Sequence, residues 1–216
     1  MKRIVLIAFL ALMAILFNAC SSGPTYVVIE TEFGDMKAEL YDSTPKHKEN
    51  FIKLVKEGFY DDLLFHRVMS GFMAQGGDPQ SKGAAPGVQL GAGSPGYTLE
   101  AEIGAPHFKG ALAAARQGDA FNPEKRSNGS QFYVVQGTPQ SDAQINSWEK
   151  RKGIQYNEAQ KEKYRTIGGR PDLDLEYTVF GEVVEGIEVI DKLCSVQTDP
   201  RNRPVQDIKM KVRIAN

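Results

Sequence analysis

The sequence predicts a mainly β protein, built as a closed antiparallel barrel that is capped by two helices and interrupted by a helical insertion. Segments rich in β-branched and aromatic residues recur along the chain, and few helical patterns accompany them. Strands and helices do not alternate regularly, which argues against a doubly wound parallel sheet. The 216 residues, 41% hydrophobic and 25% charged, suffice for one domain with a buried core plus an extension.

The amino-terminal end differs in character from the rest of the chain. A positive start at Lys2-Arg3 precedes fourteen unbroken apolar residues, 4–17. This length fits a secretory signal and is short for a membrane span of about 20 residues. We therefore expect a signal peptide over residues 1–19.

Cys20 follows the small residue Ala19 just beyond the apolar run. This arrangement resembles the lipid-accepting cysteine of a bacterial lipoprotein signal, with Phe17 standing where leucine is usual. The resemblance implies a lipidated Cys20, a short tether over 20–24, and a domain over 25–216 that is anchored to the membrane and faces the periplasm of a bacterial cell envelope. A cleaved ordinary signal and an uncleaved anchor are the alternatives.

Charge and cysteine content argue against nucleic-acid binding and against an intramolecular disulfide. The formal net charge is −1 and no basic block with interleaved aromatic residues is present, so nucleic-acid binding is not expected. The chain has two cysteines, and a lipidated Cys20 leaves Cys194 without a disulfide partner. Cys194 should then be a free, mostly buried thiol.

Residues 25–41 predict a β-hairpin with one buried face, because β-forming residues flank a turn at 33–35. A helix should follow, with Thr44 as its N-cap, Pro45 at its first position and Gly58 near its end. His47 on this helix is expected to be a solvated surface residue.

The stretch 64–79 mixes apolar and polar side chains more closely than an ordinary strand does. Ser70-Gly71 predicts a turn between two extended arms, and Gln75 falls on the same face as Met73. This hairpin would place the cation of Arg67, one amide and several large apolar side chains around one concave surface. The glycine-rich segment 75–96 predicts a long loop folded over the barrel.

Strand-like composition returns at 97–100, 131–136, 176–184 and 208–214, and helical spacing occurs at 187–193. Residues 110–115, Gly-Ala-Leu-Ala-Ala-Ala, are ambiguous because their composition alone favours a helix.

Three motifs occur in one order along the chain. They are Phe65-His66-Arg67-Val68 with Gly71-Phe72-Met73 and Gln75-Gly76-Gly77-Asp78, then Asn128-Gly129-Ser130-Gln131-Phe132-Tyr133, then Val179-Phe180-Gly181-Glu182-Val183. Together they resemble the signatures of the cyclophilin family of peptidyl-prolyl isomerases, and the resemblance covers Tyr26 to Ile214. It implies an eight-stranded cyclophilin-like barrel, with residues 110–115 as a strand that lines the peptide groove.

The resemblance also implies an activity and its partners. The protein would be a monomeric peptidyl-prolyl cis-trans isomerase that acts on proline-containing polypeptides in the folding of exported proteins, without a metal or an organic cofactor. Twisting an X-Pro bond breaks its amide resonance and makes the nitrogen an acceptor. By resemblance, Arg67 donates to that nitrogen and Gln75 binds polar groups of the substrate. The groove residues implied in the same way are Phe72, Met73, Ala115, Arg116, Gln131, Tyr133, Leu173 and Tyr177.

The site departs from the best-known eukaryotic members at four positions. Those proteins have tryptophan, asparagine, histidine and phenylalanine where this chain has Asp172, Arg116, Tyr177 and Tyr133. The three histidines, His47, His66 and His107, lack the spacing of a hydrolytic or metal site, so the sequence assigns them no chemistry.

An insertion over residues 141–170 interrupts the family pattern. Ile145 and Trp148 share one helical face, Gly153 would end a helix, and 157–160 has the form of a capping box. The insertion is either a helical hairpin that decorates the barrel or a rim that extends the groove or docks a partner.

Two other functions compete with isomerisation. A chaperone or holding module would bind proline-containing segments with little turnover, and a scaffold would act through residues 141–170. The presence of Arg67, Phe72, Met73 and Gln75 favours the isomerase.

Overall fold

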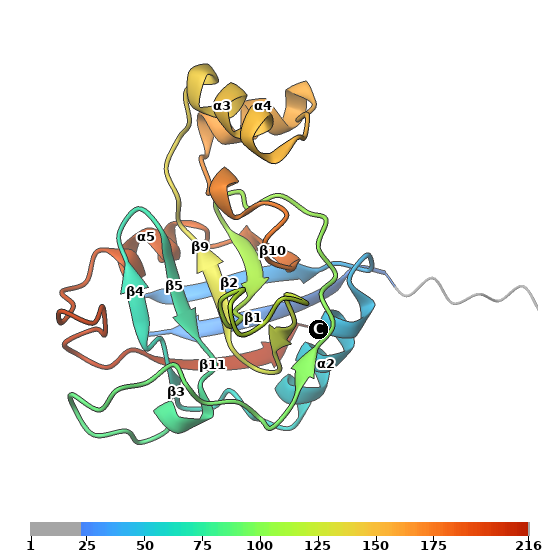
Figure 1. Ribbon diagram of the computed structural model, residues 1–216. Coiled ribbons are helices and arrows are strands. Elements are labelled where there is room, and N and C mark those ends of the chain that lie inside the picture. Colours follow the sequence, from blue (N-terminus) through green and yellow to red (C-terminus); the bar gives the residue numbers. More distant parts are fainter. Residues whose placement is uncertain (1–22, 216) are drawn as a thin grey trace, which may run out of the picture.

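Nine strands form one curled antiparallel sheet in the computed structural model, which describes residues 23–215 (Figure 1). Their order across the sheet is β3-β11-β1-β2-β10-β7-β9-β5-β4. The strands are β1 (Thr25–Thr31), β2 (Gly34–Leu40), β3 (Leu63–Leu64), β4 (Arg67–Met69), β5 (Met73–Gly76), β7 (Ala111–Ala114), β9 (Phe132–Val135), β10 (Val179–Glu185) and β11 (Lys209–Ile214). A second small sheet pairs β6 (Thr98–Leu99) with β8 (Ser127–Asn128).

The predicted signal peptide and Cys20 lie outside the described residues. Within residues 23–215, no helix combines the length and the apolar character that crossing a membrane requires.

The closed eight-stranded barrel is not confirmed. The two edges of the sheet are β3 and β4, which do not pair with each other in the described chain. The loop that contains Asn202 lies instead at the outer edge of β4, where the backbone N–H of Val68 donates to the Asn202 carbonyl at 2.8 Å. Because this loop occupies the edge, the sheet is a half-barrel.

The two predicted capping helices are α2 (Pro45–Lys56) and α5 (Glu188–Cys194). Pro45 lies in the first turn of α2 as expected, although the Thr44 side chain makes no capping hydrogen bond. Both helices bury apolar side chains in the main core, which also contains the inner faces of β1, β2 and β11. Cys194, in α5, is a free and buried thiol, as expected, and burial raises its pKa to about 12.

His47 is buried, so the expectation of a solvated residue is wrong. Its Nδ1 lies 2.6 Å from Oε2 of Glu102, and its Nε2 lies 2.9 Å from Oγ of Ser127. These partners are 55 and 80 positions away along the chain, so no local pattern could indicate them.

Residues 111–114 form a strand, β7, although their composition favours a helix. The strand lies between β10 and β9 and pairs with both. Hydrogen bonds from two neighbours thus override the weak intrinsic preference of alanine.

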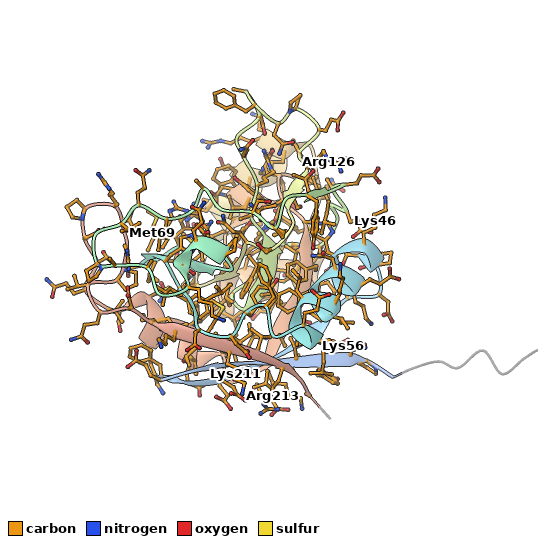
Figure 2. All side chains as sticks on the ribbon, turned by 90° about the horizontal axis from the view of Figure 1, so that it is seen from below. Lys46, Lys56, Met69, Arg126, Lys211 and Arg213 are labelled. Atoms are coloured by element: carbon orange, nitrogen blue, oxygen red, sulfur yellow. The ribbon has the colours of Figure 1, made fainter. Side chains whose placement is uncertain are left out.

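The last strand alternates as predicted. Met210 and Val212 of β11 are buried, whereas Lys211 and Arg213 are exposed. Figure 2 shows both basic side chains pointing away from the core.

The loop predicted over 75–96 begins two residues later than expected, because Gln75 and Gly76 belong to β5. Residues 77–96 are mostly loop, with one turn of 3-10 helix at Pro79–Ser81. The buried Asp78 carboxylate fixes it by accepting hydrogen bonds from the backbone N–H groups of Gln80, Gly91 and Gly93.

The insertion is the predicted pair of helices, α3 (Asp142–Lys152) and α4 (Glu158–Thr166), which stand together at one end of the sheet (Figure 1). Capping boxes begin both helices, at Ser141 and at Asn157. Ile145, Tyr156 and Tyr164 form a small core of their own.

Side chains of β9 alternate between two apolar clusters. Phe132 and Val134 belong to the main core, whereas Tyr133 and Val135 belong to a second cluster on the opposite face of the sheet. The second cluster is where the groove residues gather.

Replacing Phe132 with alanine should lower the free energy of unfolding by about 3–5 kcal/mol, because the ring is 1% exposed and packs against three other aromatic rings. Phe121→Ala is the matched control, since that ring is 86% exposed and its loss should change the unfolding free energy by less than about 0.5 kcal/mol. Urea unfolding of both variants checks this, and equal losses would contradict the assignment of Phe132 to the core.

Candidate active site

The hairpin of β4 and β5 positions the first site residues. Arg67 pairs directly with Gln75, and Met69 pairs with Met73. The turn between the strands places Gly71 at φ +70°, in the region that favours glycine, and its N–H donates to Oε1 of Gln136 at 2.7 Å. The predicted hairpin is therefore confirmed.

One row of directly opposed residues crosses five strands. Arg67 on β4 faces Gln75 on β5, and Gln75 faces Tyr133 on β9. Tyr133 faces Ala113 on β7, which in turn faces Val179 on β10. Opposed residues share a face of the sheet, so the row brings the cation, the amide and the pocket to one surface.

Two glutamines extend the polar end of this row. Nη1 of Arg67 donates to Oε1 of Gln75 at 3.2 Å, and Nε2 of Gln75 donates to Oε1 of Gln131 at 3.0 Å. Nε2 of Gln131 then donates to the carbonyls of Gly91 and Gly93 at 3.0 and 2.7 Å. The chain of bonds fixes both amides, and it directs the oxygen of Gln75 at the guanidinium.

Arg67 carries a charge that no neighbouring carboxylate neutralises. Within residues 23–215 it forms no salt bridge, and its second hydrogen bond runs from Nη2 to the sulfur of Met69 at 3.1 Å. Burial lowers the pKa of Arg67 below its ordinary value, and an arginine guanidinium stays charged at neutral pH. Several of its five N–H groups are thus available to a ligand.

The apolar part of the site lies beside Arg67. Its guanidinium carbon is 5.7 Å from the ring centroid of Phe72. The second cluster brings together six of the predicted groove residues, namely Phe72, Met73, Ala115, Tyr133, Leu173 and Tyr177. The rings of Tyr133 and Tyr177 meet edge to face at 5.9 Å.

The side chain of Arg116 is held by neighbouring residues, and its backbone groups make no hydrogen bond within the described chain. The side chain is 4% exposed, donates to the Glu176 carbonyl at 2.8 Å and lies over the Tyr177 ring at 4.6 Å. Among the hydrogen bonds of the described chain, none uses the backbone N–H or carbonyl of Arg116. The arrangement fits the expected contact of this backbone with a substrate.

Arg170 is a site residue that the sequence did not identify. Its guanidinium lies 4.0 Å from the ring centroid of Phe72, and two hydrogen bonds of 2.7 and 2.6 Å hold it against Asp172. Phe72 therefore contacts two arginines. Asp172, noted as a departure from tryptophan, serves to fix the planar side chain that stacks on the pocket wall.

His107 and Asp174 were also missed. His107 lies behind the pocket, with Nε2 3.1 Å from the hydroxyl of Tyr133 and Nδ1 2.9 Å from Oδ1 of Asp174. Both are buried, and 67 residues separate them along the chain. No motif or spacing links them, so only the fold could bring them together.

The surroundings of His66, next to Arg67, indicate a structural role for this histidine. It is 4% exposed, and within the described residues neither ring nitrogen has a hydrogen-bond partner of normal geometry. Burial lowers its pKa to about 4, because the charge of Asp78 and the carbonyl of Leu64 offset only part of the cost of protonating it. The ring is therefore neutral at physiological pH.

Comparison with known proteins gives one consistent result. The family model for cyclophilin type peptidyl-prolyl cis-trans isomerases matches residues 26–214. A protein of Staphylococcus haemolyticus assigned as a peptidyl-prolyl cis-trans isomerase is 34% identical over 188 residues, which are 84% of this chain and 86% of that one. A Staphylococcus aureus protein with the same assignment is 32% identical over 187 residues, or 86% of this chain and 89% of that one.

Solved structures agree with the sequence relatives. The crystal structure of a cyclophilin type peptidyl-prolyl cis-trans isomerase from Cryptosporidium parvum superposes with a TM-score of 0.63 at 26% identity, covering 90% of this chain and 99% of that one. The same protein crystallised in the presence of the dipeptide Ala-Pro gives a TM-score of 0.61 at 25% identity, covering 88% of this chain and 99% of that one.

Acid should destabilise the protein through His66. The unfolded chain binds a proton at this histidine below about pH 6.5, whereas the folded chain does so only near pH 4, so stability falls as the pH is lowered between these values. The free energy of unfolding should fall by about 3 kcal/mol over this range. Urea unfolding of wild type and His66→Gln at several pH values checks it. The free energy of unfolding of the variant should fall less over this pH window than that of wild type. The pKa of His47 is also lowered, but its effect is the same in both proteins and cancels in the comparison. Parallel curves of unfolding free energy against pH would therefore contradict the role of His66.

Proposed function

The chain belongs to the cyclophilin-type peptidyl-prolyl cis-trans isomerases, and from this premise we propose that the groove beside Arg67 is its catalytic site. The observation that carries the proposal is a charged guanidinium without a carboxylate partner in the described chain, placed at the edge of an apolar pocket. An apolar pocket can hold a proline ring, and a free donor beside it can reach the imide nitrogen.

Arg67 acts by binding the twisted state of the substrate better than either planar isomer. The barrier to X-Pro rotation, about 18–20 kcal/mol, reflects the loss of amide resonance. When the bond twists, the nitrogen lone pair becomes available as an acceptor. A donor aimed at this lone pair stabilises the transition state selectively, which is the condition for catalysis.

Arg67 does not supply the whole acceleration. Reducing the isomerisation time from tens of seconds to milliseconds requires an acceleration of about 10⁴-fold, which corresponds to lowering the barrier by about 5.5 kcal/mol. One preorganised donor contributes about 2.7–4 kcal/mol of this. The remainder comes from holding the substrate in one orientation. Phe72, Met73, Tyr133 and Leu173 hold the proline ring, and the hydrogen-bonded pair of Gln75 and Gln131 fixes the polar groups beside it.

We also propose that the enzyme assists the folding of exported proteins at a bacterial cell envelope. The support is the amino-terminal sequence, with its Lys2-Arg3 start, apolar run and Ala19-Cys20. The first strand begins at Thr25, five residues after Cys20. A fully extended chain of this length spans at most about 18 Å, so a lipid on Cys20 would hold the domain close to the membrane surface.

Arg67→Ala should reduce the isomerisation rate about 10²–10³-fold while leaving the affinity for a proline peptide nearly unchanged, because the donor acts mainly on the twisted state. NMR exchange spectroscopy on an Ala-Pro peptide measures the rate, and chemical-shift titration measures affinity. Arg213→Ala is the matched control, since this arginine is exposed on β11. Wild-type binding without exchange would instead favour the holding module, and a normal rate in Arg67→Ala would refute the role of Arg67.

Cys20 should incorporate a palmitate label in cells, and globomycin should block the processing of the precursor. Cys20→Ser should lose the label, whereas Cys194→Ser, which changes the buried thiol, should keep it. A mature chain that begins after Cys20 would overturn the proposed anchor.

A further inference from the structure

The helical insertion reaches the groove through a buried chain of hydrogen bonds. Tyr156 and Tyr164, from the small core of the insertion, both donate to Oδ2 of Asp174, at 2.5 and 2.6 Å. The other carboxylate oxygen of Asp174 contacts His107, and His107 contacts Tyr133. Each of these five residues is at most 7% exposed.

Asp174 is the central acceptor of this chain. Its Oδ1 accepts from the backbone N–H of His107 at 2.7 Å as well as from the ring at 2.9 Å. With two tyrosine hydroxyls on Oδ2, the carboxylate has four donors. Burial and then the charge on Asp174 raise the pKa values of Tyr156 and Tyr164, so both hydroxyls keep the protons they donate.

The carboxylate also fixes the proton on His107. An ionised carboxylate only accepts, so the proton of a neutral His107 lies on Nδ1 and leaves Nε2 as an acceptor. The hydroxyl of Tyr133 is 3.1 Å from Nε2 and can donate to it. The two rings lie nearly parallel, with 14° between their planes. Tyrosine at position 133 therefore has a partner that phenylalanine would leave unsatisfied.

The backbone strengthens the same connection. The N–H of Arg170, at the end of the insertion, donates to the carbonyl of His107 at 2.8 Å, and Gly169 bridges to Phe108. Nζ of Lys152, in α3, donates to the carbonyl of Asp174 at 2.7 Å. The insertion thus holds both the backbone and the side chains of the His107–Asp174 pair.

We propose that Tyr156 and Tyr164 of the insertion, acting through Asp174 and His107, position Tyr133 in the proline pocket, so that the insertion sets the rate of isomerisation. The inference rests on the proposed function of the groove, because Tyr133 is one of its walls. All four upstream residues are positioning residues, since none of them lies in the groove itself. A hairpin that merely decorates the sheet would need only its apolar contacts.

The test is a double-mutant cycle on soluble protein that begins at Ser22. Tyr156→Phe/Tyr164→Phe removes two hydroxyls and keeps both rings, so the insertion should stay folded. We expect exchange of a bound Ala-Pro peptide to slow about fivefold, with affinity changed less than about twofold. Tyr133→Phe should slow exchange similarly. Adding Tyr156→Phe/Tyr164→Phe to Tyr133→Phe should slow it no further.

The cycle separates positioning from a general loss of structure. Additive slowing would overturn the proposal, because it would show that the insertion does not act through the Tyr133 hydroxyl. An unchanged rate in Tyr156→Phe/Tyr164→Phe would do the same. Tyr60→Phe is the matched control, since it removes a buried hydroxyl that donates to the Ser130 carbonyl, outside this chain of bonds. It should exchange at the wild-type rate.

Wild-type protein offers a test that does not depend on the folding of variants. The ¹⁵N shifts of His107 should show a proton on Nδ1, and an unprotonated Nδ1 would overturn the arrangement. A further outcome is that wild-type protein shows the expected ¹⁵N shifts and yet does not catalyse cis-trans exchange of the peptide. That result would refute the proposed function of the groove and leave the hydrogen bonds from the insertion to Tyr133 in place.

Discussion

The site depends on the register of five neighbouring strands. Arg67, Gln75, Tyr133, Ala113 and Val179 oppose one another in a single row, and this places the donor, the amide and the pocket wall on one face. A slip of one residue in β5 would turn Gln75 and Met73 toward the opposite face. Alternation along β9 fixes the same register, because Phe132 fills the main core whenever Tyr133 faces the groove.

The other wall of the groove is built by residues 170–177, at the end of the insertion and directly after it. Leu173 and Tyr177 close the pocket, Arg170 stacks on Phe72, and Asp174 accepts hydrogen bonds from the insertion. This wall has little regular secondary structure, so side-chain hydrogen bonds must hold it. Two of the four departures noted in the sequence, Asp172 and Tyr177, lie in this segment. The other two, Arg116 and Tyr133, contact the ring of Tyr177 from neighbouring elements.

Charge is arranged differently at Arg67 than at two other arginines near the groove and in the insertion. Arg165, in the insertion, contacts three carboxylates, and Arg170 has two bonds to Asp172. Those arginines are satisfied, and they serve to hold structure. Arg67 is half-buried with an amide, a thioether and the Phe72 ring beside it, and burying its charge without a carboxylate costs stability. The proposed role of Arg67 in binding the substrate accounts for this cost.

The sequence alone determined the family, most strand positions, the helical insertion and the hairpin that carries Arg67, because these follow from local patterns and contiguous motifs. Residues 111–114 needed the resemblance, since composition favoured a helix there. Only the tertiary structure decided that the sheet stays open at β4, that His47 is buried, and that Asp174 joins the insertion to Tyr133 through His107. Each of these depends on partners far apart along the chain, whose meeting no local pattern encodes.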